Sequence, residues 1–198
     1  MSIDRGDTGE VLRQVTVARG MIEVSGPSGY CIDPDALRDS PRESFVLLAS
    51  CTILEGVAMA GAEPAILTVT VSAPEPDVPT PGAAELAAAA GGAGVLAARE
   101  AEGLSLVHLE RGGDVLLPGG DQRHWRGATR RGERVIGLAV YAPRDGRLAG
   151  ADGGALLVAL ADRVRLRLPE TALATPDSVP DATTARRRPA AWLRGLFN

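Results

Sequence analysis

The stretch E-R-V-I-G-L-A-V-Y-A at residues 133–142 follows Q-R-H-W-R-G-A-T-R at residues 122–130, and only Arg131 and Gly132 separate them. Beyond its first two residues, the later stretch carries no charge and is rich in Val, Ile and Leu, which is typical of a buried β-strand. Two extended stretches joined by a short glycine-containing turn predict a β-hairpin, whose strands are antiparallel.

More strands are predicted upstream of this hairpin. Leu104–Glu110 and Asp114–Leu117 flank R-G-G and predict a second hairpin. Ser44–Cys51 is apolar on both faces, as expected of a central strand covered on both sides, and Pro64–Ser72 alternates apolar and polar residues like a half-exposed strand. The shorter extended stretches are Val11–Val24, as a strand pair or one bulged strand, and Tyr30–Asp33.

Two helices are predicted between and after these strands. Ala83–Glu100 is rich in Ala but is weakened by three glycines, and Asp152–Arg167 has an amphipathic pattern. Pro34–Glu43 allows one helical turn. We therefore expect an α+β fold, with a mostly antiparallel sheet built from hairpins and about two helices packed on one face. The order of elements is analogous to a PsbP/Mog1-like sandwich.

The length of 198 residues fits one domain with appendages. We expect a disordered start at 1–10, a single domain at 11–168, a proline-containing disordered linker at 169–185 and a basic tail at 186–198. The net charge of −4 gives no general attraction to nucleic acid. No apolar run is long enough to predict a membrane-spanning helix.

The tail combines four arginines with apolar residues that would share one face of a helix. Such a segment can lie on an anionic membrane surface or dock into a groove of a protein partner; a solvated chain end is the simpler alternative. The contact residues would be Arg186, Arg187, Arg188, Trp192, Leu193, Arg194, Leu196 and Phe197.

Cys31 and Cys51 are the only cysteines and lie on two neighbouring extended stretches. A disulfide between them would close a loop of about twenty residues and stabilise the fold by about 3 kcal/mol. Two buried thiols that pack as small apolar groups are the alternative. A redox-active pair is disfavoured, because the sequence has no C-x-x-C motif.

No catalytic motif, cofactor fingerprint or metal-ligand spacing is present, so we predict no catalytic residues, no cofactor and no metal. Cys31 with His108 or His124 is the one conceivable nucleophile arrangement, and nothing in the spacing supports it. The loop at 117–125 is the best candidate for ligand binding, with Asp121, Arg123, His124 and Trp125 gathered near two glycines. The alternative is a hairpin connection whose Trp125 packs into the core.

The segments G-Y-C-I-D at 29–33, F-V-L-L-A-S-C at 45–51 and the later W-R to L-A-V stretch at 125–140 resemble a group of alphaproteobacterial proteins of the Rhodobacterales type. The similarity spans about residues 20–165. It implies an exported, periplasmic or envelope-associated domain with its cysteines paired, and it implies no activity. The printed N-terminus lacks the basic start and apolar region of a secretory leader.

These observations favour a non-enzymatic, envelope-associated structural or interaction module. A module that binds a small ligand through the 117–125 loop is the second hypothesis. A small hydrolase that uses Cys31 or His124 is the third.

Overall fold

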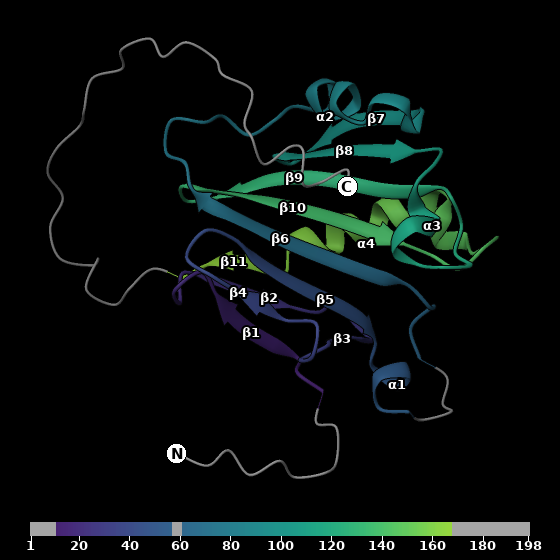
Figure 1. The fold of residues 1–198 in the computed structure, drawn as a ribbon, viewed down its shortest axis with the longest axis horizontal. Helices are drawn as coiled ribbons and strands as arrows, with labels where there is room; N and C mark the ends of the chain where they lie inside the picture. The colour runs from purple at the N-terminus through teal and green to yellow at the C-terminus, as the bar shows by residue number, and fades with distance from the viewer. Residues whose placement is uncertain (1–10, 57–60, 168–198) are drawn as a thin grey trace, which may run out of the picture.

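The computed structural model describes residues 11–56 and 61–167 of the chain, which form two antiparallel sheets and several short helices (Figure 1). The strands are β1 Gln14–Val17, β2 Ile22–Ser25, β3 Tyr30–Ile32, β4 Arg38–Asp39, β5 Ser44–Ser50, β6 Ile66–Pro74, β7 Val95–Ala101, β8 Leu104–Leu109, β9 His124–Arg131, β10 Arg134–Tyr141 and β11 Val164–Leu166. The α-helices are α1 Cys51–Leu54, α2 Ala83–Ala89, α3 Gly113–Leu116 and α4 Ala151–Ala161, and the 3-10 helices are η1 Gly91–Ala93 and η2 Arg147–Ala149.

The larger sheet has the strand order β3-β5-β6-β10-β9-β8-β7, with β4 beside β5, and the smaller sheet has the order β1-β2-β11. Every neighbouring pair is antiparallel. The α+β class and the antiparallel sheet predicted from the sequence are therefore confirmed. The hairpin of 122–142 is also confirmed as β9 and β10, and all eight residues of β10 are buried.

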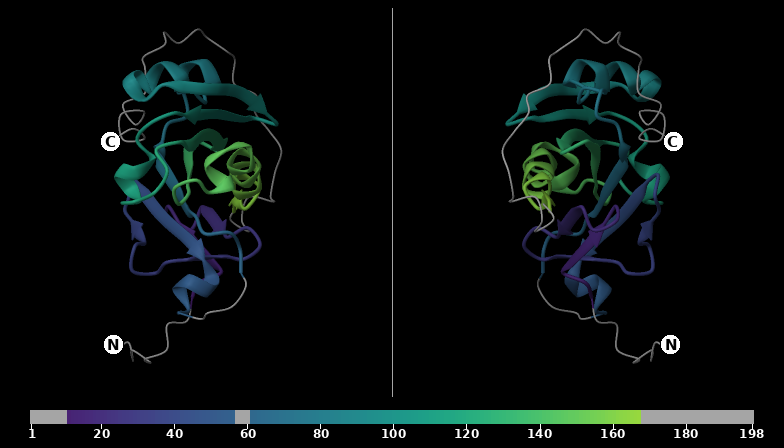
Figure 2. Two further views of the ribbon diagram at one scale, coloured as in Figure 1. Left: turned by 90° about the vertical axis from the view of Figure 1, so that its right-hand side faces the viewer. Right: turned by 90° about the vertical axis from the view of Figure 1, so that its left-hand side faces the viewer.

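One face of the larger sheet carries the main hydrophobic core. Alternate residues of β6 (Leu67, Val69 and Val71) are fully buried on this face, where Leu157 and Leu160 of α4 join the same core cluster. Figure 2 shows α4 almost end-on against this side of the sheet, with the smaller sheet next to it. Burial of this apolar surface, at about 25 cal/mol per Å², is the main contribution to stability.

The opposite face, which carries Val107 of β8 and which we call the outer face, has its own cover. Leu86 and Ala90 at α2 form a second cluster with Val107, Leu109 and Ala128. Successive residues of a strand point to opposite faces, so β8, in which every residue except His108 is buried, needs cover on both sides. The helices α2 and α4 therefore lie on opposite faces, whereas the sequence led us to expect both on one face.

The two predicted helices are both shorter than expected. The chain of 83–100 is α-helical only to Ala89, because Gly91 and Gly94 adopt left-handed φ angles of 55° and 71°, and the short 3-10 helix η1 follows at Gly91–Ala93. The following residues form the edge strand β7, which pairs with β8. In the same way, α4 ends at Ala161, and β11 then pairs with β2. Pairing with an available strand outweighs the local helical pattern at both places.

Three smaller expectations also need correction. Residues 114–117 are not a hairpin strand, because β8 pairs with β7 and β9 instead and Gly113–Leu116 is the short helix α3. The stretch 34–43 contains β4 rather than a helical turn. On β5, Val46 and Leu48 are fully buried, but Phe45 and Leu47 on the outer face are only partly buried.

Among residues 11–56 and 61–167, every helix is too short to span a lipid bilayer.

Cys31 and Cys51 form a disulfide, with 4.8 Å between their Cα atoms. It joins β3 to the first residue of α1, directly after β5, and both cysteines are buried. The predicted disulfide is therefore confirmed, and the alternative of two buried thiols is excluded. The expected disordered start at 1–10, the linker at 169–185 and the basic tail at 186–198 lie outside the described residues.

Candidate functional site

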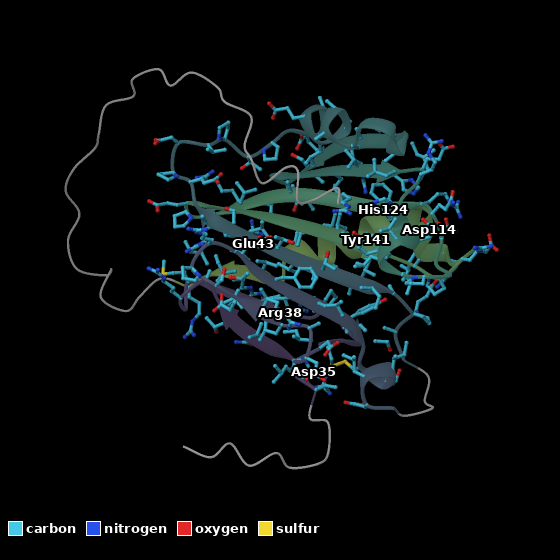
Figure 3. All side chains as sticks on the ribbon, viewed as in Figure 1. Asp35, Arg38, Glu43, Asp114, His124 and Tyr141 are labelled. Atoms are coloured by element: carbon cyan, nitrogen blue, oxygen red, sulfur yellow. A yellow bond between two sulfur atoms is a disulfide. The ribbon has the colours of Figure 1, made fainter. Side chains whose placement is uncertain are left out.

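The outer face has a pocket of about 180 Å³ at one end of β9 and β10, next to α3 (Figure 3). It lies between the turns after α2 on one side and α3 on the other. Its wall consists of apolar and aromatic side chains with two arginines. The lining residues are Ala90, Ala93, Leu109, Arg111, Gly112, Val115, Leu116, His124, Arg126 and Tyr141.

Two glycines bring α3 close to the start of β9. Gly112 has a φ of 102°, a left-handed conformation that favours glycine, and it starts the turn into α3. A Cβ atom on Gly113 would lie 2.5 Å from the carbonyl oxygen of Asp121, so only glycine fits there. The amide of Gly113 donates a hydrogen bond of 2.8 Å to the Gln122 carbonyl. The glycine pair of 112–113 therefore fixes one wall of the pocket.

The floor of the pocket is set by the alternation of β9 and its pairing with β10. His124 and Arg126 lie two residues apart on β9 and share the outer face with Tyr141 of β10. The rings of His124 and Tyr141 stack with centroids 5.3 Å apart, and the Arg126 guanidinium lies 5.6 Å from the centre of the Tyr141 ring. Figure 3 shows His124 and Tyr141 side by side, with Asp114 close by.

Burial decides the charge states in this pocket. It lowers the pKa of His124 to about 4, with a further contribution from the positive charge of Arg126, so His124 is neutral at pH 7. Burial also lowers the pKa of Arg126 and raises that of Tyr141. Among the described residues, the charged side chains of the lining are Arg111 and Arg126, both cationic. The pocket therefore has a positive, mostly apolar interior.

The structure separates the four residues that the sequence singled out in the 117–125 loop. Asp121 forms a bidentate pair with Arg123, with distances of 3.0 and 2.9 Å, and also accepts a hydrogen bond of 3.1 Å from the Asp145 amide. The hydrogen bonds from Arg123 hold the pKa of Asp121 well below its usual range. This pair ties the loop to the turn after β10, and neither residue lines the pocket.

Trp125 faces the opposite way, into the main core. Its indole nitrogen donates a 2.7 Å hydrogen bond to the Gly150 carbonyl, and its ring stacks on His108 with centroids 4.5 Å apart. Gly153 and Gly154 of α4 leave room for this ring, because a Cβ atom on either would come within 3.0 Å of it. Trp125 thus packs in the core, and His124 is the one residue of the four that lines the pocket.

The geometry bears on the other chemical hypotheses. The sulfur of Cys31 is bonded to Cys51, so the predicted hydrolase variant with a Cys31 nucleophile is wrong for this oxidised state. His108 is partly buried, shares a 2.8 Å hydrogen bond with the Ala149 carbonyl and stacks on Trp125, as a structural histidine does. No group of three potential metal ligands occurs among the described residues.

Sequence reasoning missed most of the pocket. The sequence did contain a signal for Arg126 and Tyr141. His124 and Arg126 lie two residues apart on a predicted strand and so share a face, and Tyr141 lies at the end of the strand predicted to pair with it. Arg111, Val115 and Leu116 were out of reach, since their stretch was assigned to a hairpin rather than to α3.

No protein-family model matches the chain, and no curated protein matches it. Among solved structures, the chain is similar to cyanobacterial PsbP (CyanoP) from Synechocystis sp. PCC 6803. The TM-score is 0.44 and the sequence identity 14%, over 84% of this chain and 98% of that chain. This is a likeness of fold at a distance, and it carries no information about activity.

Proposed function

We propose that this domain is a binding module for a small ligand, with the pocket between α3 and the outer face of the sheet as its binding site. The observation that carries the proposal is the pocket itself. It combines an aromatic floor of His124 and Tyr141 with the Arg126 guanidinium in one hollow of about 180 Å³. Concave, mostly apolar sites with a few polar groups that converge are typical of ligand pockets.

The rim of the pocket supports the same interpretation. Val115 is 77% exposed and Leu116 is 44% exposed, although both are large apolar residues on a helix of only four residues. Exposed apolar side chains beside a polar rim are often found at sites that bind a ligand or partner. A bound ligand would remove part of this surface from water.

A thermal-shift screen of the full chain against small organic anions and their neutral analogues tests the proposal. A ligand present at about a hundred times its Kd should stabilise the protein by about 2.7 kcal/mol, which raises the Tm of a domain this size by about 5–10 °C. The variant Ala93→Phe fills the pocket and should lose the shift. A shift that persists unchanged in Ala93→Phe would place the ligand elsewhere.

We further propose that the module works in an oxidising, periplasmic or envelope compartment, anchored by its basic tail. The disulfide supports the compartment, because such bonds persist mainly in oxidising environments. The composition of 186–198 supports contact with an anionic membrane surface, since four arginines accompany Trp192, Leu193, Leu196 and Phe197.

Co-sedimentation with vesicles tests the tail. The full chain should pellet with vesicles that contain anionic lipid and stay in solution with purely zwitterionic vesicles. Deletion of residues 186–198 should abolish the binding. A matched variant with Trp192 and Phe197 replaced by Ala keeps all the charge and separates apolar insertion from electrostatic attraction. Equal pelleting of the deleted and full chains would refute the proposal.

A further inference from the structure

The volume of the pocket limits the size of its ligand. The pocket measures about 180 Å³, and an apolar cavity of about 150 Å³ is enough for one benzene molecule. Drug-sized ligands occupy pockets of about 300–1,000 Å³. The pocket therefore accepts a single ring with one small substituent and is too small to enclose a nucleotide.

The walls of the pocket favour a flat apolar group. His124 and Tyr141 lie nearly parallel, with 11° between their ring planes, and Leu109 and Leu116 complete the apolar lining. Aromatic rings pack well in offset stacks or edge-to-face arrangements against such side chains. His124 is neutral at pH 7, so it adds an aromatic surface without a charge.

The charges of the lining favour one negative group on the ligand. Arg111 lies at the rim, where it donates a hydrogen bond of 2.6 Å to the Gly92 carbonyl and pairs with Glu110 at 3.6 Å. Arg126 lies deeper in the pocket, where burial disfavours its charged form and lowers its pKa. A nearby anion would therefore stabilise the protonated guanidinium. A guanidinium matches the planar fork of a carboxylate particularly well.

Given the proposed function, on which this step rests, we propose that the pocket takes a small aromatic monocarboxylate. The ring of the ligand lies against Tyr141 and His124, and its carboxylate pairs with Arg126. Arg126 is the more buried of the two cations in the lining, and one buried guanidinium matches a single negative charge better than a phosphate dianion.

Calorimetric titration of the full chain with three probes tests this ligand class. Benzoate carries both ring and charge, benzamide carries the ring alone, and acetate carries the charge alone. Benzoate should bind at least ten times more tightly than either of the others, because a hydrogen bond to a charged group is lost in one case and the ring contacts in the other.

Variants locate the interaction. Arg126→Gln should weaken benzoate at least tenfold and leave benzamide unchanged, whereas Arg165→Gln, the same charge change on an exposed residue of β11, should bind benzoate like the parent. If Arg126→Gln does not fold, Arg126→Lys decides the point, because it keeps the charge but loses the fork, and it should also weaken benzoate.

The outcomes separate the two proposals. Benzamide binding as tightly as benzoate, with both lost in Ala93→Phe, would overturn the carboxylate and leave the pocket as a ligand site. Unchanged benzoate binding in both Arg126 variants would overturn the role of Arg126. Binding of no probe, or binding that Ala93→Phe does not affect, would overturn the aromatic carboxylate, and the thermal-shift screen then decides separately whether the pocket binds any ligand.

Discussion

Breaking the disulfide between Cys31 and Cys51 should cost the domain a large part of its stability. The bond spans 20 residues of sequence, and closing a loop of that length removes about 3 kcal/mol of chain entropy from the unfolded state at 25 °C. Domains have a total stability of about 5–15 kcal/mol, so this is a substantial fraction. For a domain of about 150 residues, the Tm should fall by about 6–12 °C.

The contacts around the bond indicate that the native fold should survive its loss. The paired strands β3 and β5 remain hydrogen-bonded through Tyr30–Ile32 and Leu48–Ser50, and the amide of Cys51 donates to the Gly29 carbonyl at 2.9 Å. Reduction therefore frees the unfolded chain more than it disrupts the folded one. We expect a fully folded but less stable reduced protein.

Urea unfolding followed by circular dichroism, with and without a phosphine reductant, measures the effect on one and the same sequence. With an m-value of about 2 kcal/mol/M, the midpoint should fall by about 1.5 M. The double variant Cys31→Ala/Cys51→Ala should unfold near the reduced midpoint and ignore the reductant. A reductant effect below about 1 kcal/mol, in protein whose thiols are shown to be free, would refute the entropic argument.

Further predictions concern the histidine, the tryptophan and the glycines of α4. The pKa of His124 is about 4 in the folded protein, against an ordinary value near 6.5, so the unfolded chain takes up the proton first as the pH falls. The free energy of unfolding should therefore be constant above pH 6.5 and fall by about 3 kcal/mol towards pH 4. Urea midpoints at pH 7 and 4.5 should show most of this fall, and His124→Gln should reduce it; an equal pH dependence in the variant would contradict the assignment. Trp125→Phe removes the 2.7 Å hydrogen bond to Gly150 and should cost about 1–3 kcal/mol in the same assay; no loss would show that the bond contributes nothing. Gly153→Ala places a Cβ atom 2.0 Å from the Leu148 carbonyl and should lower the Tm strongly, while Gly92→Ala, with nothing within 4 Å, should change stability by less than about 0.5 kcal/mol. Equal Tm values for the two alanine variants would refute that argument.

The strands with clear periodicity were predictable from the sequence. The hairpin of β9 and β10 and the alternation of Leu67, Val69 and Val71 on β6 all appear in the structure, because local pattern and tertiary environment agree there. The disulfide was predictable as one of a few alternatives. For two cysteines on neighbouring extended stretches, a disulfide and a pair of buried thiols are the main alternatives.

The two errors of helix length have one physical cause, which is competition between a weak helical pattern and a free sheet edge. Residues 95–101 continue an alanine-rich stretch, yet Gly94 with its left-handed φ ends the 3-10 helix η1 and β8 offers an edge to pair with. The same competition occurs after α4, where residues 164–166 pair with β2 as strand β11 instead of continuing the helix. Local sequence does not contain the edge, so it cannot predict the outcome.

The site was only partly predictable for a related reason. A loop rich in polar residues drew attention to Asp121, Arg123 and Trp125, but the register of β9 sends Trp125 to the core and His124 to the outer face. The two residues that complete the floor, Arg126 and Tyr141, come together only through pairing with β10. Because α4 covers the face of β9 that carries Trp125, the outer face with His124 is the one that lines the pocket.

The arginines of this sheet show how the pocket differs from its surroundings. The chain has no lysine, and arginines on both faces of the sheet act as clamps on backbone carbonyls. Arg130 donates to the carbonyls of Glu75 and Val78, which fixes the loop after β6. Arg131 donates to the carbonyls of Ala161, at the end of α4, and Val164, at the start of β11. These contacts satisfy carbonyls that the ends of helices and strands leave open.

Arg126 lies on the same strand but in a different setting. Its guanidinium lies over the Tyr141 ring at 5.6 Å and lines a hollow next to exposed apolar side chains. A planar cation over an aromatic ring at the bottom of an apolar pocket serves recognition better than support. The two roles predict different losses. Arg131→Gln should lower the Tm and leave benzoate binding intact, whereas Arg126→Gln should weaken benzoate binding more than it lowers the Tm. The reverse order of effects would assign Arg126 to the structural clamps.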